Sequence, residues 1–104
     1  MKRKLYIDDE RYPKTDGWDI VSSYEEFENW INENGLPDEV SFDHDLGPNQ
    51  PTGYDCAKEM MNMCYRRGWL KLPKWNVHSA NPVGRDNIIS MLKHYEKMQK
   101  LENH

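Results

Sequence analysis

Four short apolar stretches, separated by loops and amphipathic segments, constrain the fold of this sequence most strongly. They cover residues 4–7, 18–21, 39–42 and 75–77, and their length is typical of strands. Segments with helical spacing of apolar residues follow the second, third and fourth stretches. Strands that alternate with helices predict an α/β fold with a mainly parallel sheet.

Capping residues mark where the three expected helices begin. Ser23 with Glu26 has the pattern of a capping box, Thr52 or Gly53 opens the second helix, and Asn81 precedes the third. The connection between the first two strands has only about ten residues, which is short for a crossover helix. We therefore expect a loop there, and about four strands and three helices in all.

Bulk properties limit the class of protein. A chain of 104 residues is expected to be one domain, spanning residues 1–104, with one modest core. Its formal net charge of −4 argues against a protein that coats nucleic acid, although it allows a local basic site. No apolar run approaches the roughly 20 residues that span a bilayer. We expect no membrane partner.

Two cysteines bear on the redox compartment. Cys56 and Cys64 fall in the same expected helix. Eight residues of helix separate them by about 12 Å along the axis, too far for a disulfide. A reduced, cytoplasmic protein is the simplest interpretation.

Ionisable or polar side chains follow three of the four expected strands. In an open parallel sheet, ligands bind beyond the carboxyl ends of the strands. If the first, third and fourth strands are neighbours, these side chains share one edge of the sheet. They are Asp8, Asp9, Asp43, His44, Asp45, His78 and Ser79.

The carboxylates of this set suggest a metal site. Asp8, Asp9 and Asp43 offer the oxygen ligands that Mg²⁺ prefers. The alternative is that Asp8 and Asp9 only begin and cap a loop. We expect Mg²⁺ as a possible cofactor and no organic cofactor.

The two histidines suggest acid–base chemistry. Cleavage of a phosphodiester needs one group that activates water and one that protonates the leaving oxygen. His44 and His78 can divide these tasks, because the ordinary pKa of imidazole lies near neutral pH. The alternative is that each histidine is a structural hydrogen-bonding residue.

Residues 79–85 have the pattern of a phosphate cradle between a strand and a helix. Helix N-termini attract anions through free backbone N–H groups. Ser79, Asn81 and the backbone near Gly84 are the candidate phosphate ligands, and Arg11 is a candidate at the neighbouring strand end. The alternative is that Asn81 only caps the helix.

Several stretches resemble the receiver domains of response regulators: "LYIDDER", "LPDEVSFDHDLG" and "VHSA". The resemblance implies a three-layer receiver-like (flavodoxin-like) fold, truncated, with strand order 2-1-3-4. Asp43 matches the phospho-accepting position when counted along the strand, and Asp45 when counted back from Gly53. The first receiver helix is nearly absent and no residue matches the receiver lysine, so phosphorelay signalling is not expected.

The combination of "DDERYP", "FDHDLG", "TGYDCA" and "VHSANPVGR" resembles a divergent group, the cyclic-phosphate-processing receiver domains, over residues 4–95. That family is proposed to act on cyclic phosphate ends of RNA. The resemblance implies His44 and His78 as an acid–base pair, with Asp8, Asp9 and Asp43 as the acidic centre.

We therefore expect a phosphoesterase that opens a cyclic phosphodiester, either at a 2′,3′-cyclic RNA end or on a cyclic nucleotide. The alternative is a non-catalytic receiver-like module that binds a phosphorylated nucleotide or a protein partner. The expected catalytic residues are His44, His78 and Asp43; the phosphate ligands are Ser79, Asn81, Gly84 and Arg11; the metal ligands are Asp8, Asp9 and Asp43.

Overall fold

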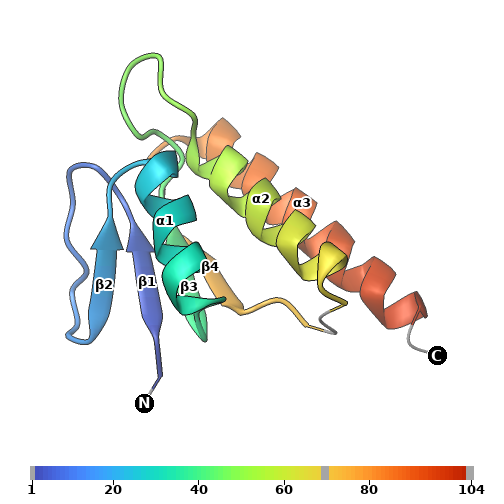
Figure 1. Cartoon of the computed structure of the whole chain (residues 1–104). Helices are drawn as coiled ribbons and strands as arrows, with labels where there is room; N and C mark the ends of the chain where they lie inside the picture. Colours follow the sequence, from blue (N-terminus) through green and yellow to red (C-terminus); the bar gives the residue numbers. More distant parts are fainter. Residues whose placement is uncertain (1, 69–70, 103–104) are drawn as a thin grey trace.

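The computed structural model describes residues 2–68 and 71–102 (Figure 1). Four strands form one sheet in the order β2-β1-β3-β4, and every neighbouring pair is parallel. This confirms the strand order and the α/β receiver-like fold predicted from the sequence. The strands are β1 (Lys4–Ile7), β2 (Trp18–Val21), β3 (Glu39–Phe42) and β4 (Lys74–Val77).

Three helices follow β2, β3 and β4, namely α1 (Tyr24–Asn34), α2 (Gly53–Arg66) and α3 (Pro82–Glu102). Their starts follow the predicted caps, with one difference. Ser23 caps α1, but the Glu26 carboxylate accepts from the backbone and hydroxyl of Ser22, so the reciprocal capping box is not formed. Thr52 and Asp55 do form such a box at the start of α2.

The three helices lie in one layer against one face of the sheet (Figure 1). The helices contact one another in chain order, α1 with α2 and α2 with α3. Their buried side chains join those of the sheet in a single core, which includes Leu5, Ile7, Val40 and Phe42. The described residues thus build two of the three layers of a full receiver, because the chain between β1 and β2 is a loop in place of a helix.

The opposite face of the sheet carries polar and aromatic side chains. Tyr6, Ser41 and Asn76 pair in register across β1, β3 and β4 and form one row. Tyr6 meets the edge of Trp18, with ring centroids 5.8 Å apart. None of the described helices covers this face, although Ser41 in the middle of the row is buried.

The start of α2 lies directly against the end of β3. Gly53 donates its N–H to the His44 carbonyl oxygen at 2.7 Å. A Cβ at Gly53 would lie 1.5 Å from the Asp43 carbonyl oxygen. Only glycine permits this approach, and it fixes the backbone that carries Asp43 and His44.

Cys56 and Cys64 are free thiols buried in the core between the helices and the sheet. Burial raises the pKa of Cys56 to about 12 and that of Cys64 to about 11. The prediction that they do not form a disulfide is confirmed.

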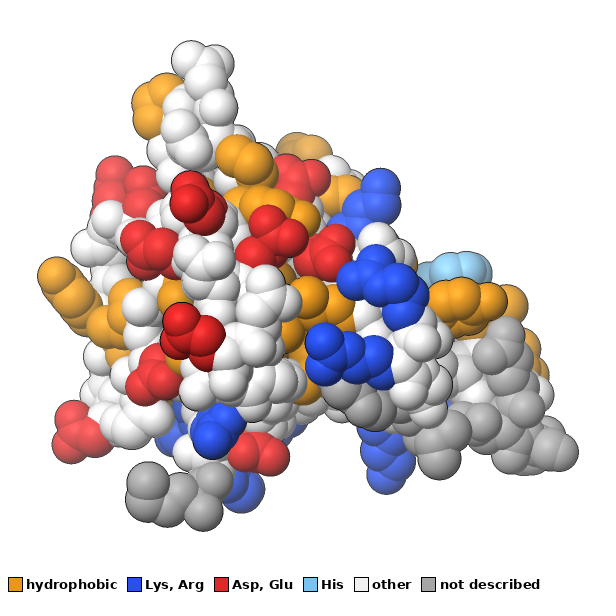
Figure 2. Space-filling view, in the orientation of Figure 1, with side chains coloured by type: hydrophobic (Ala, Val, Ile, Leu, Met, Phe, Trp, Pro, Cys, Tyr) orange, Lys and Arg blue, Asp and Glu red, His pale blue; other side chains and the backbone are white. Residues whose placement is uncertain are grey.

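The surface is strongly polar. In Figure 2, acidic side chains gather around α1 and the start of α2, and basic side chains lie toward the far end of α2. Within residues 2–68 and 71–102, no helix has both the length and the apolar character needed to cross a membrane.

Candidate functional site

The carboxyl ends of β1, β3 and β4 meet at one edge of the sheet, as expected for neighbouring parallel strands. The loops after β1 and β3 enclose a cleft of about 630 Å³ at this edge. This volume is in the range of small-molecule sites. The ionisable side chains that line it are Asp9, Glu10, Arg11, Asp43 and Asp45.

Asp8 is buried beneath this cleft and is fully hydrogen-bonded. Its Oδ1 accepts from the backbone N–H of Glu10 at 2.8 Å and of Arg11 at 2.9 Å. Its Oδ2 meets Arg11 Nε at 3.1 Å and His78 Nε2 at 3.0 Å. Burial alone would raise the pKa of Asp8, but the backbone bonds from Arg11 and Glu10, with the contact to His78, outweigh it and lower the pKa.

Three side chains, Tyr6, Ser41 and Asp8, hold the ring of His78 on the face of the sheet opposite the helices. Its ring stacks on Tyr6, with centroids 4.2 Å apart and planes 8° from parallel. Because the Asp8 carboxylate only accepts, Nε2 carries the ring proton, and Nδ1 accepts from the Ser41 hydroxyl at 2.7 Å. Burial lowers the pKa of His78 despite the nearby Asp8 charge. His78 is therefore neutral at neutral pH, with both ring nitrogens bonded.

Asp43 lies at the end of β3, beside Asp8. Its Oδ1 accepts from the backbone N–H of His44 at 2.8 Å and from Arg11 Nη2 at 3.2 Å. Burial and the charge of Asp8 raise the pKa of Asp43, although bonds from His44 and Ser79 oppose the rise. A carboxyl group with a raised pKa in a cleft is suited to carry a proton.

Arg11 joins the two buried carboxylates. Its guanidinium bonds Asp8 through Nε and Asp43 through Nη2. These bonds use two of the five guanidinium N–H donors and leave three. The side chain is 47% exposed, so these donors are accessible from the cleft.

The predicted metal ligands do lie together. Asp8, Asp9 and Asp43 each present an oxygen, and the three oxygens lie within 4.8 Å of one another. The donor type suits a hard cation such as Mg²⁺. Arg11, however, already brings a positive charge to Asp8 and Asp43, and Asp8 has no lone pair left in this arrangement. As arranged, the trio fits Arg11 better than a metal ion.

His44 lies on the other face of the sheet. Phe42 pairs with Val77, so His78 is level with Asp43, and His44 is one residue further on. Side chains alternate between the two faces along a strand. The His44 ring accordingly packs on Gly84 in the first turn of α3, where a Cβ would lie 2.2 Å from its Cγ.

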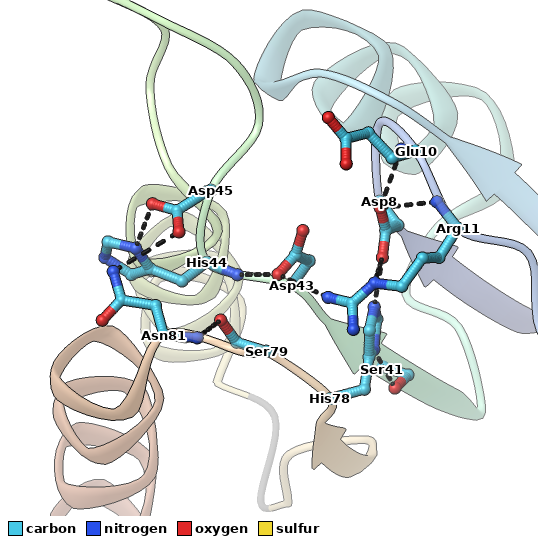
Figure 3. A network of polar contacts seen from close by, with 10 residues as sticks. All are labelled: Asp8, Glu10, Arg11, Ser41, Asp43, His44, Asp45, His78, Ser79 and Asn81. Atoms are coloured by element: carbon cyan, nitrogen blue, oxygen red, sulfur yellow. Dashed lines mark hydrogen bonds and ion pairs between the residues drawn. The ribbon is translucent and has the colours of Figure 1, made fainter.

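The two histidines therefore do not share a pocket. Figure 3 shows His44 beside Asp45 and Asn81 on one side of Asp43, and His78 beneath Arg11 on the other. His44 Nδ1 bonds Asp45 Oδ1 at 3.0 Å, and its ring lines a groove of about 780 Å³ between α2 and α3. Asp45 lines the acidic cleft, so His44 is linked to the cleft through this carboxylate.

The predicted phosphate cradle has most of its polar groups paired internally. Asn81 caps α3 by accepting from the Gly84 N–H at 3.1 Å, and its own N–H donates to Ser79 Oγ at 3.1 Å. The His44 ring occupies the space where a side chain at Gly84 would lie. Asn81 thus caps the helix, as the alternative interpretation of the sequence held. Phosphate binding by these residues stays a prediction.

Comparison with protein families bears out the resemblance seen in the sequence. The family of cyclic-phosphate processing receiver domains matches residues 3–94. The chain belongs to this family. Its membership suggests a role in the processing of cyclic phosphates. No curated protein and no solved structure matches the chain at a significant level.

Two residues of this receiver domain were not singled out from its sequence. Tyr6 supports the His78 ring, and Ser41 bonds its Nδ1. Both lie within strands, in a stretch read as buried core. The register of β1 with β3 pairs Tyr6 with Ser41, and alternation along β3 puts Ser41 on the same face as Asp43. That alternation was the available signal.

Proposed function

We propose that this receiver domain opens a cyclic phosphodiester in the acidic cleft at the carboxyl edge of its sheet. The substrate class is a 2′,3′-cyclic phosphate at an RNA end or on a nucleotide. One observation supports the proposal most directly: Arg11 is tethered to Asp8 and Asp43 with donors left over, beside a carboxyl group whose pKa is raised. A guanidinium with free N–H groups suits a phosphodiester anion.

Ring opening needs two proton carriers. Asp43 is proposed as the first, because its raised pKa keeps it closer to neutral pH than an ordinary aspartate. His44 is proposed to supply the second proton through Asp45, the carboxylate that lines the cleft and bonds His44 Nδ1 at 3.0 Å. Its Nδ1 donates to Asp45, and no described residue bonds its Nε2. His78 is proposed to position Asp8, and through it Arg11, without touching the substrate.

The test is incubation with 2′,3′-cyclic nucleotides and with RNA that ends in a 2′,3′-cyclic phosphate, followed by chromatography of the products. We expect turnover by the unmodified chain. We expect Asp43→Asn and His44→Ala to lower kcat by about 10²–10⁴-fold, the usual contribution of a general acid or base. Lys14→Gln is the control, because this exposed residue lies in the same loop as Arg11 and does not line the cleft.

Two results would speak against this assignment. The first is an absence of product from every substrate, with and without EDTA. The second is a turnover rate that is the same in the unmodified chain and in both variants.

A second candidate is a non-catalytic module that binds a phosphorylated nucleotide. It is favoured by the state of His78, whose two ring nitrogens are both occupied by protein partners. Calorimetry with cyclic and linear nucleotides separates the two candidates. Saturable binding without product favours the module, whereas product formation excludes it.

A further inference from the structure

We propose that Arg11 takes the place of a divalent cation in the acidic trio, so that the site works without a bound metal. The trio consists of Asp8, Asp9 and Asp43. This inference rests on the proposed function for its substrate, a phosphate anion, and goes beyond it in assigning the cation. The support comes from the hydrogen bonds of Asp8, the charge of Arg11 and the donors that Arg11 keeps.

The first step is the bonding capacity of Asp8. An ionised carboxylate offers about four lone-pair positions. Two backbone N–H groups take those of Oδ1, and Arg11 Nε and His78 Nε2 take those of Oδ2. Asp8 is also buried, with 2% exposure. A metal ion can bind Asp8 only if Arg11 or His78 first breaks its hydrogen bond to the Asp8 carboxylate.

The second step is charge. The guanidinium bonds Asp8 at 3.1 Å and Asp43 at 3.2 Å, the two buried members of the trio. An arginine in a protein is always protonated, so this charge does not depend on pH or on the supply of metal. A divalent cation beside the same two carboxylates would be repelled by it at close range. Arg11 and a metal ion therefore exclude one another.

The third step links the cation to the substrate. A bound Mg²⁺ would contact phosphate directly, as a bridge between carboxylate and phosphate oxygens. The three remaining N–H donors of Arg11 can make the equivalent bridge by hydrogen bonding. Arg11 lines the cleft and is 47% exposed, so a phosphate oxygen has access to these donors.

The test is titration with Mn²⁺ in the absence of substrate, with free Mn²⁺ measured by electron paramagnetic resonance. We expect the unmodified chain to show no saturable binding. Arg11→Gln removes the competing charge and is expected to bind one Mn²⁺, with half-saturation at least about tenfold below the highest Mn²⁺ concentration at which the unmodified chain shows no binding. Arg11→Lys keeps a charge near the trio and is expected to behave as the unmodified chain does.

Lys14→Gln is the matched control, because it removes one positive charge from the same loop and is expected to gain no binding. Circular dichroism checks that each variant is folded. Equal Mn²⁺ affinity in the unmodified chain and in Arg11→Gln, whether tight or absent, would overturn the proposal. So would an equal gain in Lys14→Gln or in Arg11→Lys.

This titration is independent of the proposed function, because it contains no nucleotide. A chain without phosphoesterase activity can still show the expected difference in Mn²⁺ binding, and an active chain can lack it. Where turnover is present, EDTA is expected to leave the rate unchanged, and loss of turnover in EDTA would also overturn the inference.

Discussion

At the scale of single residues, one step along the chain decides which histidine faces which side of the sheet. Asp43 and His78 are level with each other and lie on the open face, where Tyr6 and Ser41 hold the His78 ring. His44 comes one residue after Asp43 and points to the helices. The alternation of β3 continues past Phe42 and places His44 and His78, which look equivalent in the sequence, on different sides of the sheet.

The environment of His78 predicts a pH dependence of stability. Burial holds its folded-state pKa below the ordinary value of 6.5. Below pH 6.5 the unfolded chain binds a proton that the folded chain does not, so the free energy of unfolding falls as the pH drops toward the folded pKa. Above pH 6.5 His78 is neutral in both states, and the stability that is lost at lower pH is fully present. Urea unfolding between pH 8 and pH 5 measures the slope.

We expect His78→Gln to flatten this slope. At pH 8 it should also lower the free energy of unfolding by about 1–3 kcal/mol, because the bonds to Asp8 and Ser41 are lost or weakened. His94→Gln, at an exposed position on α3, is the control. An identical slope in the unmodified chain and in His78→Gln would mean that the pKa of His78 is not lowered by folding.

At the scale of elements, local signals predicted the strands and helices well. The apolar stretches became the four strands, and the caps at Ser23, Thr52 and Asn81 begin the three helices. Each of these signals depends on neighbours in the sequence. The relation of His44 to His78 depends instead on the register of β3 with β4, which a sequence pattern does not report.

The contact between α2 and β3 gives a prediction at this scale. Gly53→Ala would put a Cβ 1.5 Å from the Asp43 carbonyl oxygen, where only backbone can move away. We expect the free energy of unfolding to fall by about 3 kcal/mol or more, as in severe overpacking. Denaturant unfolding measures the loss, with Lys58→Ala on the exposed side of α2 as control. A loss equal to that of the control would mean that α2 can shift freely at its start.

At the scale of the whole molecule, a single helical layer and one sheet enclose one core. The sequence predicted the truncation, because the first connection has only about ten residues, with Pro13 and Gly17 as breakers, and is short for a crossover helix. It did not predict the roles of Tyr6 and Ser41. Their importance arises only because the His78 side chain, directly after β4, lies on the face that a helix would cover in a full receiver.

The buried cysteines provide a probe of this core. Cys56 and Cys64 are both 0% exposed, and their pKa values of about 12 and about 11 leave almost no thiolate at pH 8. We expect no reaction with a thiol reagent in the native state and two reactive thiols in denaturant. Val83→Cys, at a position that is 71% exposed, is the control for prompt labelling. Rapid labelling of Cys56 or Cys64 in the native state would mean that the core opens locally at a free-energy cost far below that of global unfolding.

The side-chain alternation at the end of β3 also has an evolutionary consequence. His44 and Asp43 are neighbours in the chain but belong to different faces, one looking into a groove between helices and the other into a cleft above the sheet. An insertion or deletion of one codon just after Phe42 would change which side chain faces the cleft. The four strands would keep their register, because the change lies beyond the end of β3.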